Sequence, residues 1–152
     1  MQPGGGGIQA ARNVIETALR ENSDSIDLLA EEVRILIAQR RTDLAFRLVE
    51  EYIRCYPHNA RAGALLGTLL WDRGDRDEAA AEVRAALARD PQLAEARESL
   101  IHWAMEMGRA PEALQLADAG LAMDASDTRW LHARALSLIH ISEPTRLRRR
   151  SY

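Results

Sequence analysis

The sequence predicts an all-α fold in which antiparallel helix pairs stack into a superhelix with a period of 34 residues. Two observations lead to this prediction. Small or apolar residues recur every 34 positions in several independent columns, and each repeat contains two stretches of helical apolar spacing separated by a break. No stretch shows the sustained alternation of apolar and polar residues that is typical of strands, so we expect none.

The 34-residue period is visible in five columns. They are Ala11, Ala45, Ala79 and Ala113; Ile15, Val49, Val83 and Ala117; Leu19, Ile53, Leu87 and Leu121; Gly74 and Gly108; and Pro57 and Pro91. Shared periodicity of this kind is typical of repeats that bury their apolar faces against one another.

The helix boundaries are clearest in the copy between Asn59 and Leu93. Gly74 suits the left-handed position that ends a first helix. Asp75, followed by Glu78 three residues later, resembles a capping box that begins the second helix. Pro91 stops that helix because proline has no amide proton to donate.

The same signals, applied along the chain, predict the helices. We expect them at residues 9–21, 26–39, 43–55, 60–72, 76–89, 94–107, 111–123 and 128–140. Connections of a few residues favour antiparallel neighbours. Small residues in the columns of Gly67 and Ala79 predict a close approach of paired helices.

These residues resemble the tetratricopeptide repeat (TPR) family over about residues 8–135. The best copy, 60–93, matches the family pattern at Leu66-Gly67, Leu70, Gly74-Asp75, Glu78-Ala79, Ala86-Leu87 and Asp90-Pro91. The 94–127 copy has Ile101 and Ala125 in place of the pattern's glycine and proline. The 26–59 copy is weaker, because Val33 and Arg40 replace glycines.

The resemblance implies a TPR solenoid over residues 9–135. We expect a half repeat at 9–25, full repeats at 26–59, 60–93 and 94–127, and an interrupted repeat from 128. The Gly-rich residues 1–8 are expected to form a flexible leader.

The C-terminal residues 136–152 resemble a translated sequencing-library adapter. The eleven residues Leu136 to Arg146 match the in-frame translation of a transposase-type adapter; the alternative is a natural helix end followed by a basic tail. We expect Pro144 to end the last helix and the tail to be disordered. The segment holds four arginines and one glutamate, so the net charge of −3 becomes −6 without it.

The resemblance also implies a binding groove. First helices of TPR pairs line a concave surface that holds an extended peptide or a partner helix. The family's groove positions, carried onto this sequence, are Arg34, Ile37, Arg61, Thr68, Trp71, Glu98, His102, Met105 and Arg129. The Ile37, Trp71 and Met105 column is the strongest candidate contact; alternatively, its side chains pack between repeats.

The arginines of this set could bind a carboxylate by paired hydrogen bonds, or could simply be solvated. The Lys and Asn set of the family's carboxylate clamp is missing, since all 20 basic residues are arginine and Arg34 and Thr68 occupy the Asn column. We therefore do not expect chaperone C-terminal tails as ligands.

Other classes of function find little support. The acidic balance argues against a nucleic-acid binder, and no apolar run is long enough to cross a membrane. No catalytic constellation, cofactor motif or metal-ligand spacing is present. Cys55 is expected to be a small, partly buried residue rather than a nucleophile. Arginine in place of lysine and abundant alanine are typical of a GC-rich bacterial coding sequence, and we expect a cytoplasmic protein.

Two further hypotheses remain open. The chain could be the N-terminal accessory array of a larger bacterial enzyme, such as a glycosyltransferase or sulfotransferase, whose catalytic domain lies downstream. It could also associate with itself through the unfinished C-terminal end. Our main expectation is non-enzymatic binding of a protein or peptide.

Overall fold

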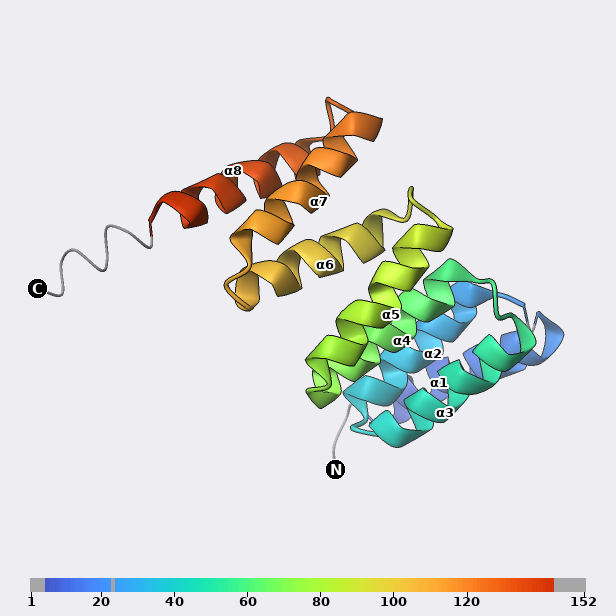
Figure 1. Ribbon diagram of the computed structural model, residues 1–152. Coiled ribbons are helices and arrows are strands. Elements are labelled where there is room, and N and C mark those ends of the chain that lie inside the picture. The colour runs from blue at the N-terminus through green and yellow to red at the C-terminus, as the bar shows by residue number, and fades with distance from the viewer. Residues whose placement is uncertain (1–4, 23, 144–152) are drawn as a thin grey trace, which may run out of the picture. The chain divides into compact units, whose positions relative to one another are not determined.

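The computed structural model describes residues 5–22 and 24–143, and every regular element among them is a helix (Figure 1). The helices are α1 (Gly5–Glu21), α2 (Ile26–Ala38), α3 (Thr42–Cys55), α4 (Ala60–Arg73), α5 (Arg76–Arg89), α6 (Ala94–Glu106), α7 (Ala110–Met123) and α8 (Thr128–Ser142). The predicted all-α class is confirmed, and the expected helix bounds agree with these to within four residues.

The chain divides into two compact parts, and each is described by itself. The N-terminal part runs to Asp90 and contains α1 to α5; the C-terminal part begins at Pro91 and contains α6 to α8. In the N-terminal part, each helix packs against the next, and α2 also contacts α4. In the C-terminal part, α7 packs against both α6 and α8. We continue to propose the division into 34-residue repeats, with α2, α4, α6 and α8 as first helices.

The core of the N-terminal part depends on a close approach between α4 and α5. A Cβ atom at Gly67 would overlap the Val83 side chain and lie 3.1 Å from the Ala79 carbonyl oxygen. Gly67, Ala79 and Val83 are all buried. The expectation that small residues bring paired helices together is therefore confirmed here.

The C-terminal part has its own apolar cluster. Its buried members are Ile101, Ala104, Ala113, Ala117 and Trp130. Trp130 lies against Gly120, where a Cβ would meet the indole ring at 2.8 Å. Arg97 is also buried here: its Nη1 donates to the Leu116 carbonyl at 3.1 Å and its Nη2 to the Pro91 carbonyl at 3.0 Å.

Capping distinguishes the two kinds of helix. Ser25, Asn59 and Asp127 cap α2, α4 and α8 with side-chain oxygens that accept backbone amide hydrogens. These residues stand in one 34-residue column, where α6 has Leu93 instead. The capping prediction at Asp75 is half wrong. Asp75 is the N-cap residue of α5, but its carboxylate pairs with the Arg73 guanidinium and caps no amide.

The breaks between paired helices use left-handed backbone. Gly74 and Gly108 have φ values of 102° and 71°, as their place in the sequence predicts. In the first copy the same column holds Arg40, which adopts φ 59° despite its side chain. Three copies therefore share one backbone conformation, whether or not glycine is present.

The ends of the chain differ from expectation. α1 begins at Gly5, four residues before its expected start, so Gly5–Gly7 belong to a helix and not to a flexible leader. α8 continues to Ser142, and the buried Ser137 hydroxyl donates to the Ala133 carbonyl at 2.8 Å. The predicted end of the last helix at Pro144 and the predicted disordered tail both lie outside the described residues.

Of the helices described, none is both long and apolar enough to cross a membrane; a cytoplasmic location stays a prediction.

Candidate functional site

The predicted groove residues form two groups, one in each part of the chain. Arg34 and Ile37 lie on α2, and Arg61, Thr68 and Trp71 lie on α4; we call these five residues the α2–α4 face. Glu98, His102 and Met105 lie on α6, and Arg129 lies on α8; we call these four the α6–α8 face. Each face therefore joins two first helices.

An ion pair connects the two helices of the α2–α4 face. Arg61 Nη1 lies 2.7 Å from Asp27 Oδ1, and the two residues are 34 positions apart. Their side chains are 39% and 78% exposed, so water screens the attraction strongly. The pair therefore contributes little to the stability of the contact between α2 and α4.

Apolar side chains lie further along the α2–α4 face. Ile37 is 36% exposed, while Trp71 is half-buried. The guanidinium of Arg76, at the start of α5, lies 5.1 Å from the centre of the Trp71 ring. This contact fixes one side of the indole. Trp71 is thus intermediate between the two alternatives, an exposed contact and a packed core residue.

Two polar members of the α2–α4 face, Arg34 and Thr68, are exposed, while Arg61 is half-buried. Arg34 forms an ion pair with Glu31, one turn earlier on the same helix. The Thr68 hydroxyl donates to the Ala64 carbonyl at 3.1 Å. Both arginines of this face are therefore paired with carboxylates of the chain itself, which the sequence analysis did not foresee. An incoming carboxylate would have to displace Glu31 or Asp27.

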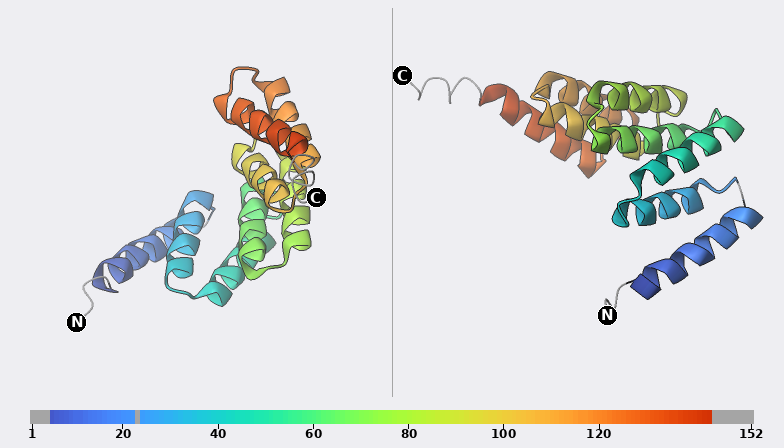
Figure 2. Two further views of the ribbon diagram at one scale, coloured as in Figure 1. Left: turned by 90° about the vertical axis from the view of Figure 1, so that its left-hand side faces the viewer. Right: turned by 90° about the horizontal axis from the view of Figure 1, so that it is seen from below.

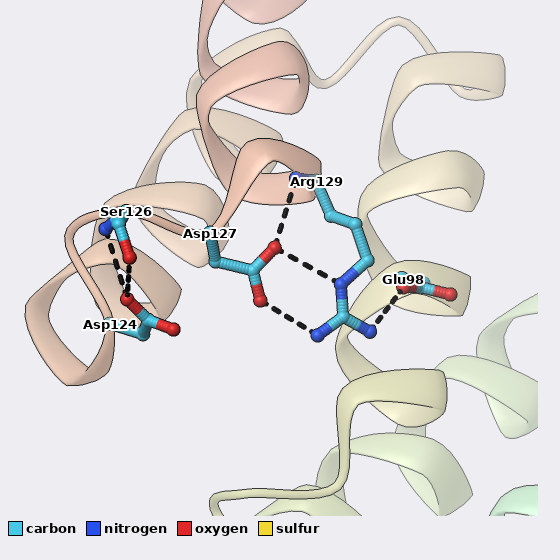
Figure 3. A network of polar contacts seen from close by, with 5 residues as sticks. All are labelled: Glu98, Asp124, Ser126, Asp127 and Arg129. Carbon is cyan, nitrogen blue, oxygen red and sulfur yellow. Dashed lines mark hydrogen bonds and ion pairs between the residues drawn. The ribbon is translucent and has the colours of Figure 1, made fainter.

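The α6–α8 face is organised around Arg129 (Figure 3). Its Nη1 lies 3.1 Å from Glu98 Oε1 on α6, and its Nη2 lies 2.7 Å from Asp127 Oδ2. The same guanidinium lies 5.1 Å from the centre of the Trp130 ring. Arg129 therefore connects α6 to α8 as Arg61 connects α4 to α2.

Asp127 has two roles in this network. Its Oδ1 accepts the backbone amide of Arg129 at 2.9 Å as the helix cap, and also the Arg129 Nε at 3.1 Å. These hydrogen bonds, the side-chain one first, lower the pKa of the Asp127 carboxyl. The same contacts raise the already high pKa of the Arg129 guanidinium. Both groups are therefore held in their charged forms.

The other two members of the α6–α8 face differ in exposure. His102 is exposed, and its Nε2 lies 3.1 Å from Glu106 Oε1. Met105 is half-buried against the apolar cluster, and its sulfur lies 3.7 Å from the Ser137 hydroxyl. Met105 thus lies closer to the alternative of packing between helices than to that of an exposed contact.

Metal-ligand clusters, a free cysteine and pockets are the other features of the described residues that bear on a site. Among residues 5–22 and 24–143, no three His, Cys, Asp or Glu side chains gather as metal ligands. Cys55 is exposed, which corrects the expectation of partial burial, because it ends α3. A pocket of about 210 Å³ lies beside Arg97 and Trp130, and one of about 510 Å³ is lined by Leu138, Ile139, Ser142 and Glu143.

Sequence reasoning found the members of both faces but missed their pairing. The available signal was the alternation of charge at Asp27, Arg61, Glu95 and Arg129, which stand 34 residues apart. Asp127 was missed too, although it shares a column with Ser25 and Asn59. Opposite charges one repeat apart could have revealed the pair of Arg61 with Asp27, whereas Glu98, which pairs with Arg129, lies 31 positions away and outside that column.

Comparison with known proteins matches part of the chain to a family of repeats. Residues 70–136 match the family described as Tetratricopeptide repeat. Among curated proteins, none matches this sequence significantly.

Solved structures share the fold of nearly the whole chain. TTC0263, a thermophilic TPR protein of Thermus thermophilus, has a TM-score of 0.75 at 21% identity, over 88% of this chain and 74% of its own. MamA has a TM-score of 0.66 at 15% identity, over 89% and 74%. YrrB, described as a TPR protein with an unusual peptide-binding site, has a TM-score of 0.63 at 22% identity, over 84% and 66%. At these identities the likeness establishes the fold.

Proposed function

Because this chain has the tetratricopeptide-repeat fold, with a family match over residues 70–136, we propose that it binds a segment of another protein across its first helices. The fold is typical of protein-interaction modules, and the similar YrrB is described as having a peptide-binding site. The proposal goes further in assigning the contact to the α2–α4 and α6–α8 faces.

The composition of the α2–α4 face is the main observation in support. Ile37 and Trp71 present apolar surface in one 34-residue column, and the exposed Arg34 and Thr68 stand in the next. A half-buried indole with a guanidinium on one side offers a large, rigid contact area. Mixed surface of this kind suits an apolar anchor on the bound segment.

The arginines define the second feature of the ligand. Arg34 and Arg61 already hold exposed carboxylates, and such surface pairs contribute at most about 1 kcal/mol. A carboxylate of the ligand could therefore replace Glu31 or Asp27 at little cost. The proposed ligand is an extended or helical segment with an apolar side chain next to an acidic one.

Peptide selection tests this proposal. A displayed peptide library is selected against the full chain, and the affinity of the best peptide is measured by tryptophan fluorescence. Trp103 and Trp130 are 5% and 3% exposed, so a change on binding reports mainly on the half-buried Trp71. Ile37→Ser should weaken binding about tenfold or more, equivalent to about 1.4 kcal/mol.

A control on a second helix completes the design. Glu51 on α3 is exposed and lies on neither face, so Glu51→Ala should leave the affinity unchanged. Trp71→Ala removes the fluorescent reporter, so its affinity is measured by isothermal titration calorimetry beside that of the wild type. Equal affinities for wild type, Ile37→Ser and Trp71→Ala, with unchanged helical circular dichroism, would exclude the α2–α4 face as the binding surface.

A further inference from the structure

The pocket of about 210 Å³ is lined by residues of α6, α7 and α8, the helices of the C-terminal part (yellow to red in Figure 2). Its lining residues all fall between Gln92 and Trp130, so the pocket belongs to this part alone. Ala94, Gly120 and Met123 join Trp130 as its small or apolar residues. The pocket therefore lies among three consecutive helices, and much of its wall is apolar.

Arg97 lines this pocket and carries a buried positive charge. The residue is 5% exposed, and its Nη1 and Nη2 donate to the neutral carbonyls of Leu116 and Pro91. The Nε atom is also buried and has no hydrogen-bond partner among the described residues. Burial lowers the pKa of the guanidinium, and no carboxylate of residues 5–22 and 24–143 opposes that shift. Arg97 therefore lacks a counter-charge within the part of the chain that the structure describes.

An uncharged residue fills the position of Arg97 elsewhere in the chain. The 34-residue column of Arg97 contains Leu29, Gly63 and Leu131. Leu29 and Gly63 are buried as Arg97 is, so the fold accepts an apolar residue there. A buried guanidinium loses hydration that neutral carbonyls replace only in part. A charge placed at such a cost beside a pocket is a common feature of functional sites.

The other charged residues of the lining do not balance Arg97. Asp127 and Arg129 pair with each other, with Nη2 of the arginine 2.7 Å from Oδ2 of the aspartate (Figure 3). Asp124 is exposed and accepts two hydrogen bonds from Ser126, so water screens its charge. The unbalanced charge in the buried part of the lining is therefore positive.

We propose that the pocket binds a small organic acid, whose carboxylate pairs with Arg97 and whose carbon atoms pack against Trp130. The Arg97 guanidinium lies 5.9 Å from the centre of the Trp130 ring, so one small molecule can reach both. A single unbalanced positive charge matches a carboxylate better than a phosphate group, which carries nearly two negative charges at neutral pH.

The volume of the pocket limits the size of this acid. At roughly 30 Å³ for each water-sized group, about 210 Å³ holds about seven such groups. A short-chain carboxylate such as butyrate has this size, whereas a nucleotide is too large. The inference does not depend on peptide binding by the α2–α4 face.

Nuclear magnetic resonance of the full isotope-labelled chain tests the proposal with sodium butyrate as the probe. The three tryptophans each have one indole N–H signal, which Trp71→Phe and Trp103→Phe variants assign. The Trp130 signal should shift and saturate with a Kd of about 1–10 mM, as the size of the probe allows. Trp71 also lies beside a guanidinium, that of Arg76, but outside the pocket, so its signal is the internal control. Sodium chloride at equal ionic strength is the reference.

The charge is then removed from the protein and from the probe in turn. Arg97→Leu introduces the residue that Leu29 provides in the same column, and Arg97→Gln keeps an amide donor without the charge. Both should weaken butyrate binding by about tenfold or more. Butyramide has the shape of butyrate without its charge and should bind the wild type more weakly by a similar factor. The matched control is Arg109→Leu, at an exposed position of the same part, which should bind butyrate as the wild type does.

Other results would overturn the proposal. A Trp130 signal that does not saturate with butyrate would do so, as would unchanged affinity in the Arg97 variants with unchanged helical circular dichroism. Equal affinities for butyramide and butyrate would show that the guanidinium does not hold the ligand, and this comparison needs only the wild type. Saturation by sodium phosphate at a lower concentration than by butyrate would contradict the assignment to a carboxylate.

Discussion

At Arg40 the chain holds a left-handed backbone conformation without a glycine. The φ of 59° costs about 1–2 kcal/mol for a residue with a Cβ atom. Two independent backbone hydrogen bonds, from Arg40 to the Ile37 carbonyl and from Arg41 to the Leu36 carbonyl, hold the turn closed. The 34-residue period predicts the break here, but only the structure shows that the conformation persists with arginine.

Relief of this strain should stabilise the protein. Arg40→Gly should raise the free energy of unfolding by about 0.5 kcal/mol, because the removed strain exceeds the added flexibility of glycine. Urea unfolding measures the change. The matched control is Gln39→Gly at φ −83°, where nothing is strained, so it should be destabilising. A loss of stability in Arg40→Gly as large as in the control would contradict this account.

Asp127 gives a prediction about pH. Its folded-state pKa lies below the unfolded value, so the unfolded chain binds the proton more readily between the two. The stabilising contribution is therefore present above the unfolded pKa and is lost as the pH falls through the folded one. Asp127→Asn keeps a capping oxygen but not the charge.

Thermal unfolding between about pH 2 and pH 7 checks this expectation. Asp127→Asn should melt below the wild type at neutral pH, and the difference should vanish on acidification. In an Arg129→Met background the same substitution should show little dependence on pH, because the guanidinium that lowers the pKa is gone. A pH-independent difference in both backgrounds would show that the Arg129 contact is not the cause.

At the scale of helices, local sequence was a good guide to position and a poor guide to caps and ends. Glycine marks the breaks where the backbone adopts a left-handed conformation, and proline marks those where the backbone lacks an amide hydrogen to donate. Both effects depend only on the local sequence. The ion pair of Asp75 with Arg73 depends on rotamers that compete with capping. The start of α1 at Gly5 was missed because helix propensity alone disfavours glycine.

The packing of α4 on α5 allows a direct test of the paired-helix contact. Gly67→Ala should lower the free energy of unfolding by about 1–3 kcal/mol, because the new methyl would overlap Val83. In a Val83→Ala background the loss should be much smaller, since the opposing methyls are gone. Urea unfolding of the four proteins measures this coupling.

Gly7→Ala is the matched control for that cycle. A Cβ at Gly7 meets no atom within 4 Å, so alanine should raise the stability of α1 by about 0.5–1 kcal/mol. Equal losses for Gly67→Ala with and without Val83 would mean that the two helices do not depend on this contact.

At the scale of the whole molecule, the 34-residue period is the feature of the sequence that best predicts the fold. Apolar columns fix which helix faces are buried, so the fold could be predicted, whereas the membership of both first-helix faces in a binding surface stays a prediction. The pairing of Arg129 with Glu98 could not be predicted, because the two residues are 31 positions apart and join two helices whose alignment the sequence does not state. The burial of Met105 depends likewise on how α8 packs.

The central claim is that the first helices bind and the second helices support them. The most direct test follows the backbone amide signals of the isotope-labelled chain by nuclear magnetic resonance while the selected peptide is added. We predict the largest shift changes on α2 and α4, around Ile37 and Trp71, with little change on the exposed surface of α3 near Glu51. Changes concentrated on α3 and α5, with α2 and α4 unaffected, would contradict it.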